Sequence, residues 1–420
     1  MSATEISETK SCIVCGIDVI PSLDLGRQPF ANALLDARDA PYVDYPLAFA
    51  QCPNCAHGQL THFADPSDIF VDYLYASGTS QTLKDFFTWF AGRVTASLGT
   101  DVAVLELASN DGSLLDAFRA AGLDPMGIDP ARNLCEEAEA KGHRVKCGFF
   151  PDVKPDGLVD LIVAMNVTAH TPNPRAFVQG MSDVLSPGGM AVIQTSQANM
   201  IANGEFDTIY HEHYSFFSAP SMKALAESAG LTLERIELVS VHGTSFLFTL
   251  RKPGGSPKVI DFADTAEGTF FVPMPDPLPD LFQQDCPPDV AAAAFDTFVK
   301  EARAKMVTTA DLLRSHTDQG KTLGLVGVAA KALTFVKAAG IDPHYYFDEA
   351  PLKVGRFVPG APTAIQRLAA MADMDEDLVL LIGAWNFADE LTRKMREIVK
   401  GTPMEHRLTL IVHQPDLREL

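Results

Sequence analysis

Two stretches of this chain alternate short apolar runs with helical segments, and this alternation constrains the fold more than any other feature of the sequence. The first stretch extends from about residue 80 to 253. The second begins at Lys321 and continues through KTLGLVGVA, HYYFDEA, DLVLLIGA and RLTLIVHQ. Such alternation is typical of parallel strands joined by crossover helices. The sequence therefore predicts an α/β protein with two α/β units.

The segments around these stretches complete a division into three units. A chain of 420 residues is longer than one ordinary core organises, so several units are expected. The stretch 253–288 is rich in Pro, Gly and Asp, which predicts an irregular connection, and a helix is expected after it over about 290–315. We expect a cysteine-containing module over 1–78, a central α/β domain over 79–253 and a C-terminal α/β domain over 254–420.

The first unit contains two Cys-x-x-Cys pairs, Cys12/Cys15 and Cys52/Cys55. Two such turns can present four thiolates to one tetrahedral zinc ion, and with every position filled the metal is structural. In a cytosolic protein, paired cysteines of this kind indicate a metal rather than disulfide bonds. His57 follows closely and is an alternative ligand in place of one thiolate. The pattern therefore predicts a structural zinc site.

Composition limits the surroundings and partners of the protein. The net charge of −21 argues against a nucleic-acid-binding surface, which needs basic side chains to replace phosphate counterions. No apolar run reaches the roughly 18 residues that a membrane span needs. The first residues, MSATEISETK, lack the apolar core of a signal peptide. We expect a cytoplasmic monomer or weak homo-oligomer that binds neither nucleic acid nor membrane.

The central domain opens with a strand, a turn and a helix. Residues 102–107 are apolar apart from one glutamate, the small-residue turn ASNDG follows, and a helical stretch begins at Ser113. This unit places a ligand at the carboxyl edge of a parallel sheet. The next apolar run ends in Asp129, where an acidic residue suits hydrogen bonding to a ribose diol.

Several longer motifs narrow this prediction. ELASNDGSLL, AMNVTAH and FDTIYHEHYSFFS occur in that order, and the N-terminal LDLGRQPFAN and DYLYASGTS and a later segment over 348–360 accompany them. These motifs resemble ExGSNDGxLL, ANNVxAH and FDxIYHEHxSYFS of the sugar C-methyltransferases that act on nucleotide-linked 4-keto-deoxysugars. The resemblance covers nearly the whole chain. It implies a class I methyltransferase domain of Rossmann-like fold, between a four-cysteine zinc module and a C-terminal Rossmann-like domain.

The resemblance also implies S-adenosylmethionine as the methyl donor. Carried over by position, the residues that line its pocket are Glu106, Ala108, Asn110, Gly112, Asp129, Asn166 and Val167. The family has glycine where this chain has Ala108. A positive φ at an alanine costs ~1 kcal/mol or more, so we expect a negative φ there.

The most specific motif, Tyr210 to Tyr214, gathers two imidazoles, a carboxylate and two phenols. Methylation of a carbon next to a ketone needs a base tuned near neutrality and a group that stabilises the oxygen charge. Histidine is the natural base, and a neighbouring carboxylate can fix its tautomer. In a plain strand Tyr210 and His213 would face opposite sides, so a turn is expected if both meet one substrate. The alternative is that the two histidines only pack or cap a helix.

The resemblance implies roles for these positions. His213 and Tyr210 would be catalytic, with Glu212 supporting them, and Tyr75 and His170 would bind the sugar. The segment HGTS over 242–245 is similar to the family's HGGS. Here Thr replaces the second Gly, and the arginine that usually follows is missing. These two departures leave the identity of the sugar and its nucleotide open.

The C-terminal domain has a strand, a glycine-containing turn and a helix of its own, with Asp348 at the end of the next apolar run. The spacing imitates a nicotinamide-binding unit but lacks the full GxGxxG pattern. The resemblance implies instead a domain that helps to hold a nucleotide-sugar. Candidate cations for its diphosphate are Lys331, Lys353 and Arg356, which are otherwise ordinary surface charges.

Together, these features predict C-methylation of a nucleotide-linked 4-keto-6-deoxysugar at the carbon next to the ketone, through an enolate. Three alternatives stay open. The acceptor atom could be oxygen or nitrogen on another small molecule. The chain could be a zinc-containing binding protein without activity. The third alternative is a nicotinamide oxidoreductase that uses the C-terminal unit.

Overall fold

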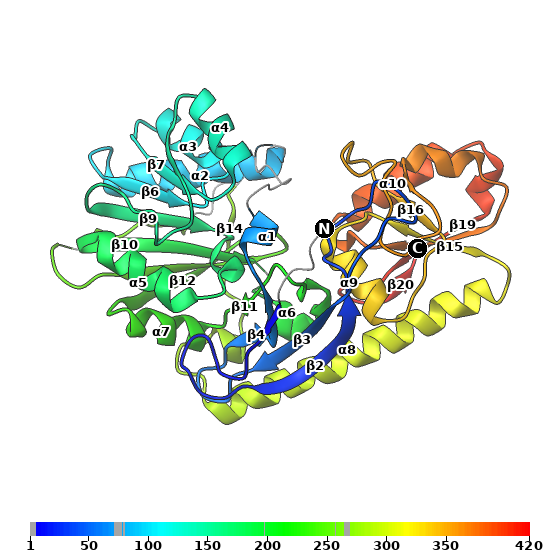
Figure 1. Ribbon diagram of the computed structural model, residues 1–420, viewed down its shortest axis with the longest axis horizontal. Coiled ribbons are helices and arrows are strands. Elements are labelled where there is room, and N and C mark those ends of the chain that lie inside the picture. Colours follow the sequence, from blue (N-terminus) through cyan, green and yellow to red (C-terminus); the bar gives the residue numbers. More distant parts are fainter. Residues whose placement is uncertain (1–5, 71–77, 79, 197, 257, 264–268) are drawn as a thin grey trace.

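The computed structural model describes residues 6–70, 78, 80–196, 198–256, 258–263 and 269–420. Three units follow one another along the chain, and a long helix runs beneath them (Figure 1). None of the described helices is both long enough and apolar enough to cross a bilayer.

The N-terminal module is a small antiparallel unit. Its main sheet has the order β11-β4-β3-β2, and a separate pair is formed by β1 and β5. The module's own elements are β1 (Ile6–Glu8), β2 (Ile20–Gln28), β3 (Tyr45–Gln51), β4 (Gly58–Leu60), β5 (His62–Ala64) and α1 (Ser67–Phe70). The fourth strand of the main sheet, β11 (Ser215–Phe216), comes from the central domain and pairs with β4. The two units are therefore joined through backbone hydrogen bonds.

The central domain is built on an eight-stranded sheet of order β14-β12-β13-β10-β9-β6-β7-β8. The parallel part contains β6 (Val104–Leu107), β7 (Met126–Asp129), β8 (Arg144–Cys147), β9 (Val159–Met165) and β10 (Leu185–Ser196). The antiparallel part contains β12 (Thr232–Val239), β13 (Ser245–Arg251) and β14 (Phe271–Val272). Strand order reverses between β6 and β9, and in such sheets this point forms a crevice that binds ligands.

Helices cover both faces of this sheet. They are α2 (Gln81–Leu98), α3 (Ser113–Ala120), α4 (Arg132–Ala140), α5 (Pro174–Val184) and α7 (Ala219–Ser228), and the short α6 (Met200–Asn203) lies near β11. Helix α7 begins after Ser218, because the Ser218 side chain caps it in a reciprocal arrangement with Ser221.

The expected irregular connection carries more structure than its composition suggests. Strand β14 lies inside it and extends the central sheet by pairing with β12. Ile260 and Phe262 are buried, and the Phe262 ring stacks on Phe90 of α2 with centroids 5.3 Å apart. Apolar residues spaced between prolines therefore cover the central domain before the chain leaves it. The predicted boundary at 253/254 stays a prediction.

The C-terminal domain has a six-stranded sheet of order β17-β16-β15-β18-β19-β20, in which all pairings except β19 with β20 are parallel. Its elements are β15 (Thr322–Val326), α9 (Ala330–Ala338), β16 (Tyr345–Phe347), β17 (Ile365–Gln366), β18 (Leu378–Ile382), α10 (Ala388–Val399), β19 (Leu408–Val412) and β20 (Arg418–Glu419). The second α/β unit predicted from the sequence is confirmed.

Helix α8 (Pro288–Thr317) joins the domains and has 30 residues, about 45 Å at 1.5 Å per residue. Its buried residues include Ala291, Phe295, Phe298, Ala302, Thr309 and Leu313. These are three, four or seven positions apart and share one face of the helix, which contacts β2 and α6 as well as β15 and β18. Figure 1 shows it in yellow below the two larger units.

Candidate functional site

The four cysteines of the two pairs converge at the N-terminal module. Their Sγ atoms all lie within 4.8 Å of one another, with Cys12 and Cys55 at 3.7 Å and Cys15 and Cys52 at 3.4 Å. Zinc–sulfur bonds of about 2.3 Å in a tetrahedron place sulfur atoms roughly 3.8 Å apart, so the set fits zinc.

Each knuckle of this cluster closes through a left-handed residue. Gly16 (φ 80°) follows the first pair and Ala56 (φ 55°) follows the second, and each donates its N–H to the carbonyl of the leading cysteine. His57, the alternative ligand, is fully buried but packs on Phe217, with ring centroids 5.0 Å apart. Within the described chain, the metal-ligating group is made of the four cysteines and does not include His57.

The turn between β6 and α3 lies at the carboxyl edge of the central sheet. Ala108, Asn110 and Gly112 have φ values of 57°, 51° and 78°. Asp129, at the end of β7, holds this turn. One of its carboxylate oxygens accepts the Asn110 N–H at 2.8 Å, and the other accepts the Ala131 N–H at 2.8 Å. The acid predicted to meet a ribose therefore also shapes the turn beside it.

The expectation of a negative φ at Ala108 is wrong. The Ala108 N–H donates to the Ile128 carbonyl of β7 at 2.7 Å, and this bond keeps the residue in the left-handed region. Alanine has roughly 1–2 kcal/mol of strain there. The turn also lies close to β7, because a Cβ at Gly127 would be 2.4 Å from the Ser109 hydroxyl oxygen.

Two buried carboxylates meet at this edge. Glu106 and Asp129 are each 4% exposed. Burial, followed by the negative charges of Asp129 and Asp111, raises the pKa of Glu106 well above its ordinary value. Glu106 Oε2 has no hydrogen-bond partner among the described residues. A ligand with hydroxyl donors and a positive charge satisfies such a pair, and S-adenosylmethionine has both.

The end of β9 carries two more of the predicted donor residues, in addition to those in the turn at 108–112, which is named the donor turn. Asn166 has φ 52°, and its side-chain oxygen accepts the Ser196 N–H of β10 at 3.3 Å. Val167 follows and leads into a 3-10 turn, Thr168–His170. The predicted donor residues Asn166 and Val167 thus lie in the chain just before the predicted sugar-binding His170.

Tyr210 and His213 form a hydrogen-bonded pair. The segment turns between them, since the His213 N–H donates to the Tyr210 carbonyl at 2.9 Å. His213 Nδ1 lies 2.9 Å from the Thr208 carbonyl, and Nε2 lies 3.0 Å from the Tyr210 hydroxyl. Because a carbonyl only accepts, Nδ1 carries the proton and Nε2 accepts the phenol proton. Burial, then the nearby His170, lowers the pKa of His213 well below its ordinary value, so the ring is neutral.

Glu212 does not fix the tautomer of His213 as the sequence suggested. Its carboxylate accepts a hydrogen bond from the Asn32 side chain at 2.5 Å, so it faces the N-terminal module. The Thr208 carbonyl holds His213 instead. A backbone carbonyl leaves no signal in the residue type, so the sequence could not reveal it. Asn32 is the last residue of LDLGRQPFAN, one of the motifs that carries the resemblance.

Two further imidazoles, those of His170 and His242, lie beside this pair. The His170 and His213 rings are 4.8 Å apart, and His170 Nδ1 donates to the Glu212 carbonyl at 2.8 Å. His242, which sequence analysis left without a role, lies near both. Burial lowers the pKa of His170 to about 4, and the charge of His242 adds to the effect. The sequence signal for His242 was the HGTS segment that contains it. Thr244 of this segment has φ 90°, in the region that favours the glycine that the family has at this position. Tyr75 lies outside the described residues.

Residues 206–216, named the catalytic segment after the predicted catalytic residues that they contain, also contact the C-terminal domain. Asp207 is fully buried, accepts the indole N–H of Trp385 at 2.7 Å and lies 3.5 Å from His413 Nε2. The Lys331 ammonium lies 4.0 Å from the centroid of the Trp385 ring. Burial lowers the pKa of Lys331, while the charges of Asp207 and Glu205 oppose this shift. Lys331 therefore lies where the C-terminal domain meets the catalytic segment.

The other two candidate cations are engaged elsewhere. Lys353 donates to the Val328 carbonyl at 2.7 Å and lies 3.3 Å from Asp348. Arg356 pairs with Asp36 of the N-terminal module at 3.3 Å. Of the three lysine and arginine candidates, the structure brings only Lys331 to the catalytic segment.

Asp348 repeats the arrangement of Asp129 in the second α/β unit. Its carboxylate oxygens accept the N–H groups of Val328 at 2.9 Å and Ala350 at 2.8 Å. Here, however, Lys353 neutralises the acid, and the turn is packed closely, since a Cβ at Gly327 would be 2.6 Å from that of Ala384. The segment whose spacing imitates a nicotinamide-binding unit therefore forms a turn like the one at Asp129. Its acid is paired with a lysine, and neighbouring residues pack closely against the turn.

Comparison with protein families gives three matches along the chain. Residues 12–70 match a family described as "Putative zinc binding domain". Residues 75–236 match "Methyltransferase domain", and residues 290–404 match "C-methyltransferase C-terminal domain". The matched segments follow the order of the three structural units.

Individual proteins are similar to the whole chain or to part of it. The chain is 28% identical over 407 residues to the C-methyltransferase NovU of Streptomyces niveus, covering 93% of each chain. A ubiquinone biosynthesis O-methyltransferase of Bradyrhizobium sp. (strain ORS 278) is 28% identical over 102 residues, 23% of this chain and 40% of that protein. Among solved structures, magnesium protoporphyrin IX methyltransferase of Synechocystis PCC 6803 with bound SAH aligns over 41% of this chain and 84% of that chain, with 11% identity and a TM-score of 0.35.

The family matches agree with the cluster of four cysteines in the N-terminal module and with the acidic turn at the carboxyl edge of the central sheet. The chain therefore belongs to the S-adenosylmethionine-dependent C-methyltransferases that carry an N-terminal zinc-binding domain and a C-methyltransferase C-terminal domain.

Proposed function

We propose that the enzyme methylates a nucleotide-linked 4-keto-6-deoxysugar at the carbon next to its ketone, through an enolate. The observation that carries this proposal is the pair of half-buried Tyr210 and buried His213, in which a neutral imidazole accepts the phenol proton at 3.0 Å. Such a pair can accept a proton from a weakly acidic C–H bond. The resemblance of the surrounding motifs to sugar C-methyltransferases supports the substrate class.

In the proposed reaction, the Tyr210 oxygen takes the proton from the substrate carbon while its own proton moves to His213 Nε2. The Thr208 carbonyl, bonded to Nδ1 at 2.9 Å, stabilises the imidazolium that results. The electron pair of the broken C–H bond forms the enolate, whose carbon then takes the methyl group. S-adenosylmethionine, when bound, would supply that group as an electrophile, and its S–CH3 bond electrons would stay on sulfur in the neutral thioether S-adenosylhomocysteine.

Other residues hold the acceptor in place. His170 Nδ1 donates to the Glu212 backbone carbonyl at 2.8 Å, which orients this ring beside His213, and the resemblance supports it as a sugar contact. Lys331 is the candidate cation for the diphosphate, because it lies at the catalytic segment. We keep Tyr75 as a proposed sugar contact on the resemblance alone. We also infer a monomer or weak homo-oligomer in a reducing compartment, the cytoplasm, where zinc thiolates persist.

Deuterium exchange tests the proposal directly. A panel of 4-keto-6-deoxy nucleotide sugars is incubated with the enzyme in deuterium oxide without methyl donor, and proton NMR follows the carbon next to the ketone. We expect exchange with at least one sugar, and that sugar should be methylated at the same carbon when donor is added. An oxygen or nitrogen acceptor would be methylated without any such exchange.

Variants locate the base. Tyr210→Phe and His213→Ala should each slow exchange by about 10²- to 10⁴-fold, the usual worth of a general base. His211→Gln is the matched control, because the His211 ring faces the Pro46 carbonyl of the N-terminal module at 3.3 Å and Gln keeps a donor there. Exchange within tenfold of the wild type in both Tyr210→Phe and His213→Ala would contradict the assignment.

A further inference from the structure

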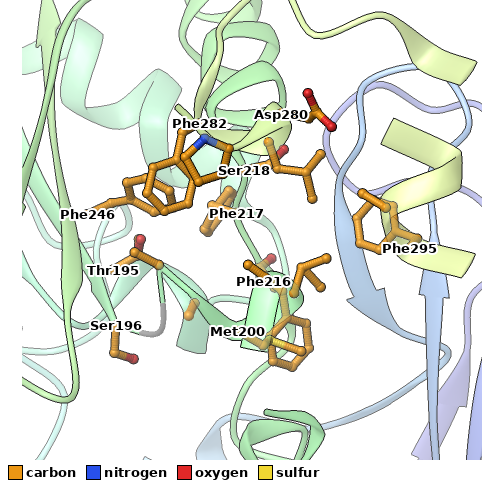
Figure 2. Close-up of a pocket in the computed structure, with 18 of the residues that line it drawn as sticks. Thr195, Ser196, Met200, Phe216, Phe217, Ser218, Phe246, Asp280, Phe282 and Phe295 are labelled. Atoms are coloured by element: carbon orange, nitrogen blue, oxygen red, sulfur yellow. The ribbon is translucent and has the colours of Figure 1, made fainter. Parts of the chain in front are cut away.

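A cavity of about 280 Å³ lies behind the catalytic segment, separate from the donor turn and the Tyr210–His213 pair. Its walls come from the end of β10, from α6, from residues 215–218, from residues 279–282 and from α8. Figure 2 shows the rings of Phe217, Phe246 and Phe282 on one side and Phe295 of α8 facing them. Five phenylalanines line it in all, including Phe216, so the cavity is largely apolar.

Two buried hydroxyl groups in this lining lack partners. Thr195 and Ser215 are 3% and 2% exposed. Their hydroxyl oxygens have no hydrogen-bond partner among the residues that the structure describes. Buried hydroxyls are normally hydrogen-bonded, because leaving one unsatisfied destabilises the fold. A pair of them in one apolar cavity indicates an occupant that carries a hydrogen-bonding group.

The chemistry of the walls excludes the substrates of methyl transfer from this cavity. Asp280 is the one charged side chain among the described lining residues, and it is negative. It would repel a diphosphate, so the charged nucleotide-linked sugar does not fit these walls. The fitting occupant is a small neutral molecule with an aromatic or aliphatic body and one polar group. Apolar cavities of about 150 Å³ already accommodate benzene.

The cavity adjoins catalytic residues on two sides. Ala169 in its wall directly precedes His170, and Ser215 and Phe216 follow the Tyr210–Tyr214 segment. The Phe216 ring also contacts the His213 ring edge-on, with centroids 6.1 Å apart. An occupant would therefore pack against the back of the segment that carries the base.

We propose that this cavity is a second ligand site, which takes a small neutral molecule with an apolar body and a hydroxyl or carbonyl group. Its occupant hydrogen-bonds to Thr195 or Ser215 and orders residues 213–218. The site is distinct from the donor and acceptor sites and does not depend on the identity of the sugar.

Two matched probes test the site by fluorine NMR on the full-length, zinc-loaded protein. 4-Fluorophenol has a hydroxyl group and fluorobenzene lacks it. We expect both to bind, with 4-fluorophenol about tenfold tighter, as expected for one added hydrogen bond. The double variant Thr195→Val/Ser215→Ala should remove this preference and leave fluorobenzene binding unchanged, because it deletes the hydroxyls and nearly keeps the shape.

A filling variant provides the second arm. Ala294→Phe on α8 should abolish binding of both probes, while Ala293→Phe, on the exposed side of the same helix, should not. Saturating 4-fluorophenol should slow hydrogen exchange of the peptide that contains residues 213–218 in the wild type but not in Ala294→Phe. Absence of binding to the wild type, a preference that survives the double variant, or binding without slower exchange would each overturn the proposal. If Ala294→Phe does not fold, the double variant Thr195→Val/Ser215→Ala still tests whether the probes bind in this cavity.

Discussion

The donor turn and the catalytic segment lie at the same edge of the central sheet but are built in different ways. The donor turn is held mainly by its own domain, through Asp129 and the Ile128 carbonyl one strand away, and Asp111 also accepts the N–H of Gly78, the last residue of the predicted first unit, at 3.0 Å. The catalytic segment is held by three contacts, two with the N-terminal module and one with the C-terminal domain. Glu212 bonds to Asn32 of the N-terminal module, Asp207 bonds to Trp385 of the C-terminal domain, and β11 joins the zinc-module sheet.

This difference separates binding of the methyl donor from catalysis. A site made from consecutive strands of one sheet is stable as long as that sheet is. A segment fixed by two neighbouring domains loses its geometry when either neighbour moves, and a misplacement of 1 Å can cost about 10²-fold in rate. We therefore expect changes in the flanking domains to lower turnover and to leave donor affinity nearly unchanged.

Removal of zinc should have the largest effect. The binding energy of a structural zinc ion is folding energy, so chelation should unfold the module that contacts Glu212 and pairs with β11. We expect methyl transfer to fall by at least about 10²-fold, while the dissociation constant of S-adenosylmethionine, measured by calorimetry, stays within about threefold. Cys52→Ser should behave like chelation, and Cys286→Ser, outside the cluster, should not. Equal losses of donor affinity and turnover would contradict the separation.

Asp129→Asn should produce the opposite pattern. The amide has one acceptor oxygen, so it cannot hold both the Asn110 and Ala131 amides and still meet a ribose. We expect donor binding weaker by about 10- to 100-fold, the worth of a hydrogen bond to a charged group. Asp348→Asn is the matched control, because that residue makes the same two backbone contacts in the other α/β unit. If both substitutions weaken donor binding equally, the two acids do not differ in function as proposed.

A decrease in pH should change the contributions of His211, in the catalytic segment, and Glu106, next to the donor turn, to the stability of the fold in opposite directions. Burial lowers the pKa of His211 to about 4, below its unfolded value near 6.5, so the unfolded chain binds the extra proton and stability falls as pH decreases from 6.5. Glu106 has a raised pKa, so its contribution is present at low pH and is lost as pH rises. Between pH 7 and 5, His211→Gln should remove about 2 kcal/mol of the acid destabilisation, as measured by urea unfolding. An unchanged pH dependence would show that His211 is not buried as a neutral ring.

Trp385→Phe should have the smallest effect of the four. It removes the N–H donor of the fully buried Asp207 and keeps most of the ring under Lys331. We expect kcat to fall by about 3- to 10-fold, corresponding to one partly compensated hydrogen bond, with donor affinity unchanged. Phe387→Leu is the control in the same short helix, because Phe387 is 55% exposed. A kcat equal to that of the wild type would show that the C-terminal domain does not position the catalytic segment.

The sequence predicted those parts of the site that are formed by residues close to one another along the chain. The cysteine pairs, the turn after β6 and the acid after β7 are local patterns with fixed spacing. The Tyr210–His213 turn followed from the geometry of strands. The partners of the catalytic segment could not be foretold, because Asn32 and Trp385 lie 180 and 178 residues from Glu212 and Asp207. The left-handed Ala108 was missed because its hydrogen bond to β7 outweighs the preference of the residue.

Helix α8 sets the spacing between the zinc-module sheet and the C-terminal sheet, since one continuous rod contacts both. An α-helix turns about 100° per residue, so an insertion of one residue in its middle would rotate one domain against the other, and seven residues would nearly restore the original direction. Chimeras that exchange C-terminal domains between relatives should therefore keep this helix whole, and their junctions belong outside 288–317. The length of helix α8 therefore restricts which recombined genes encode an active enzyme.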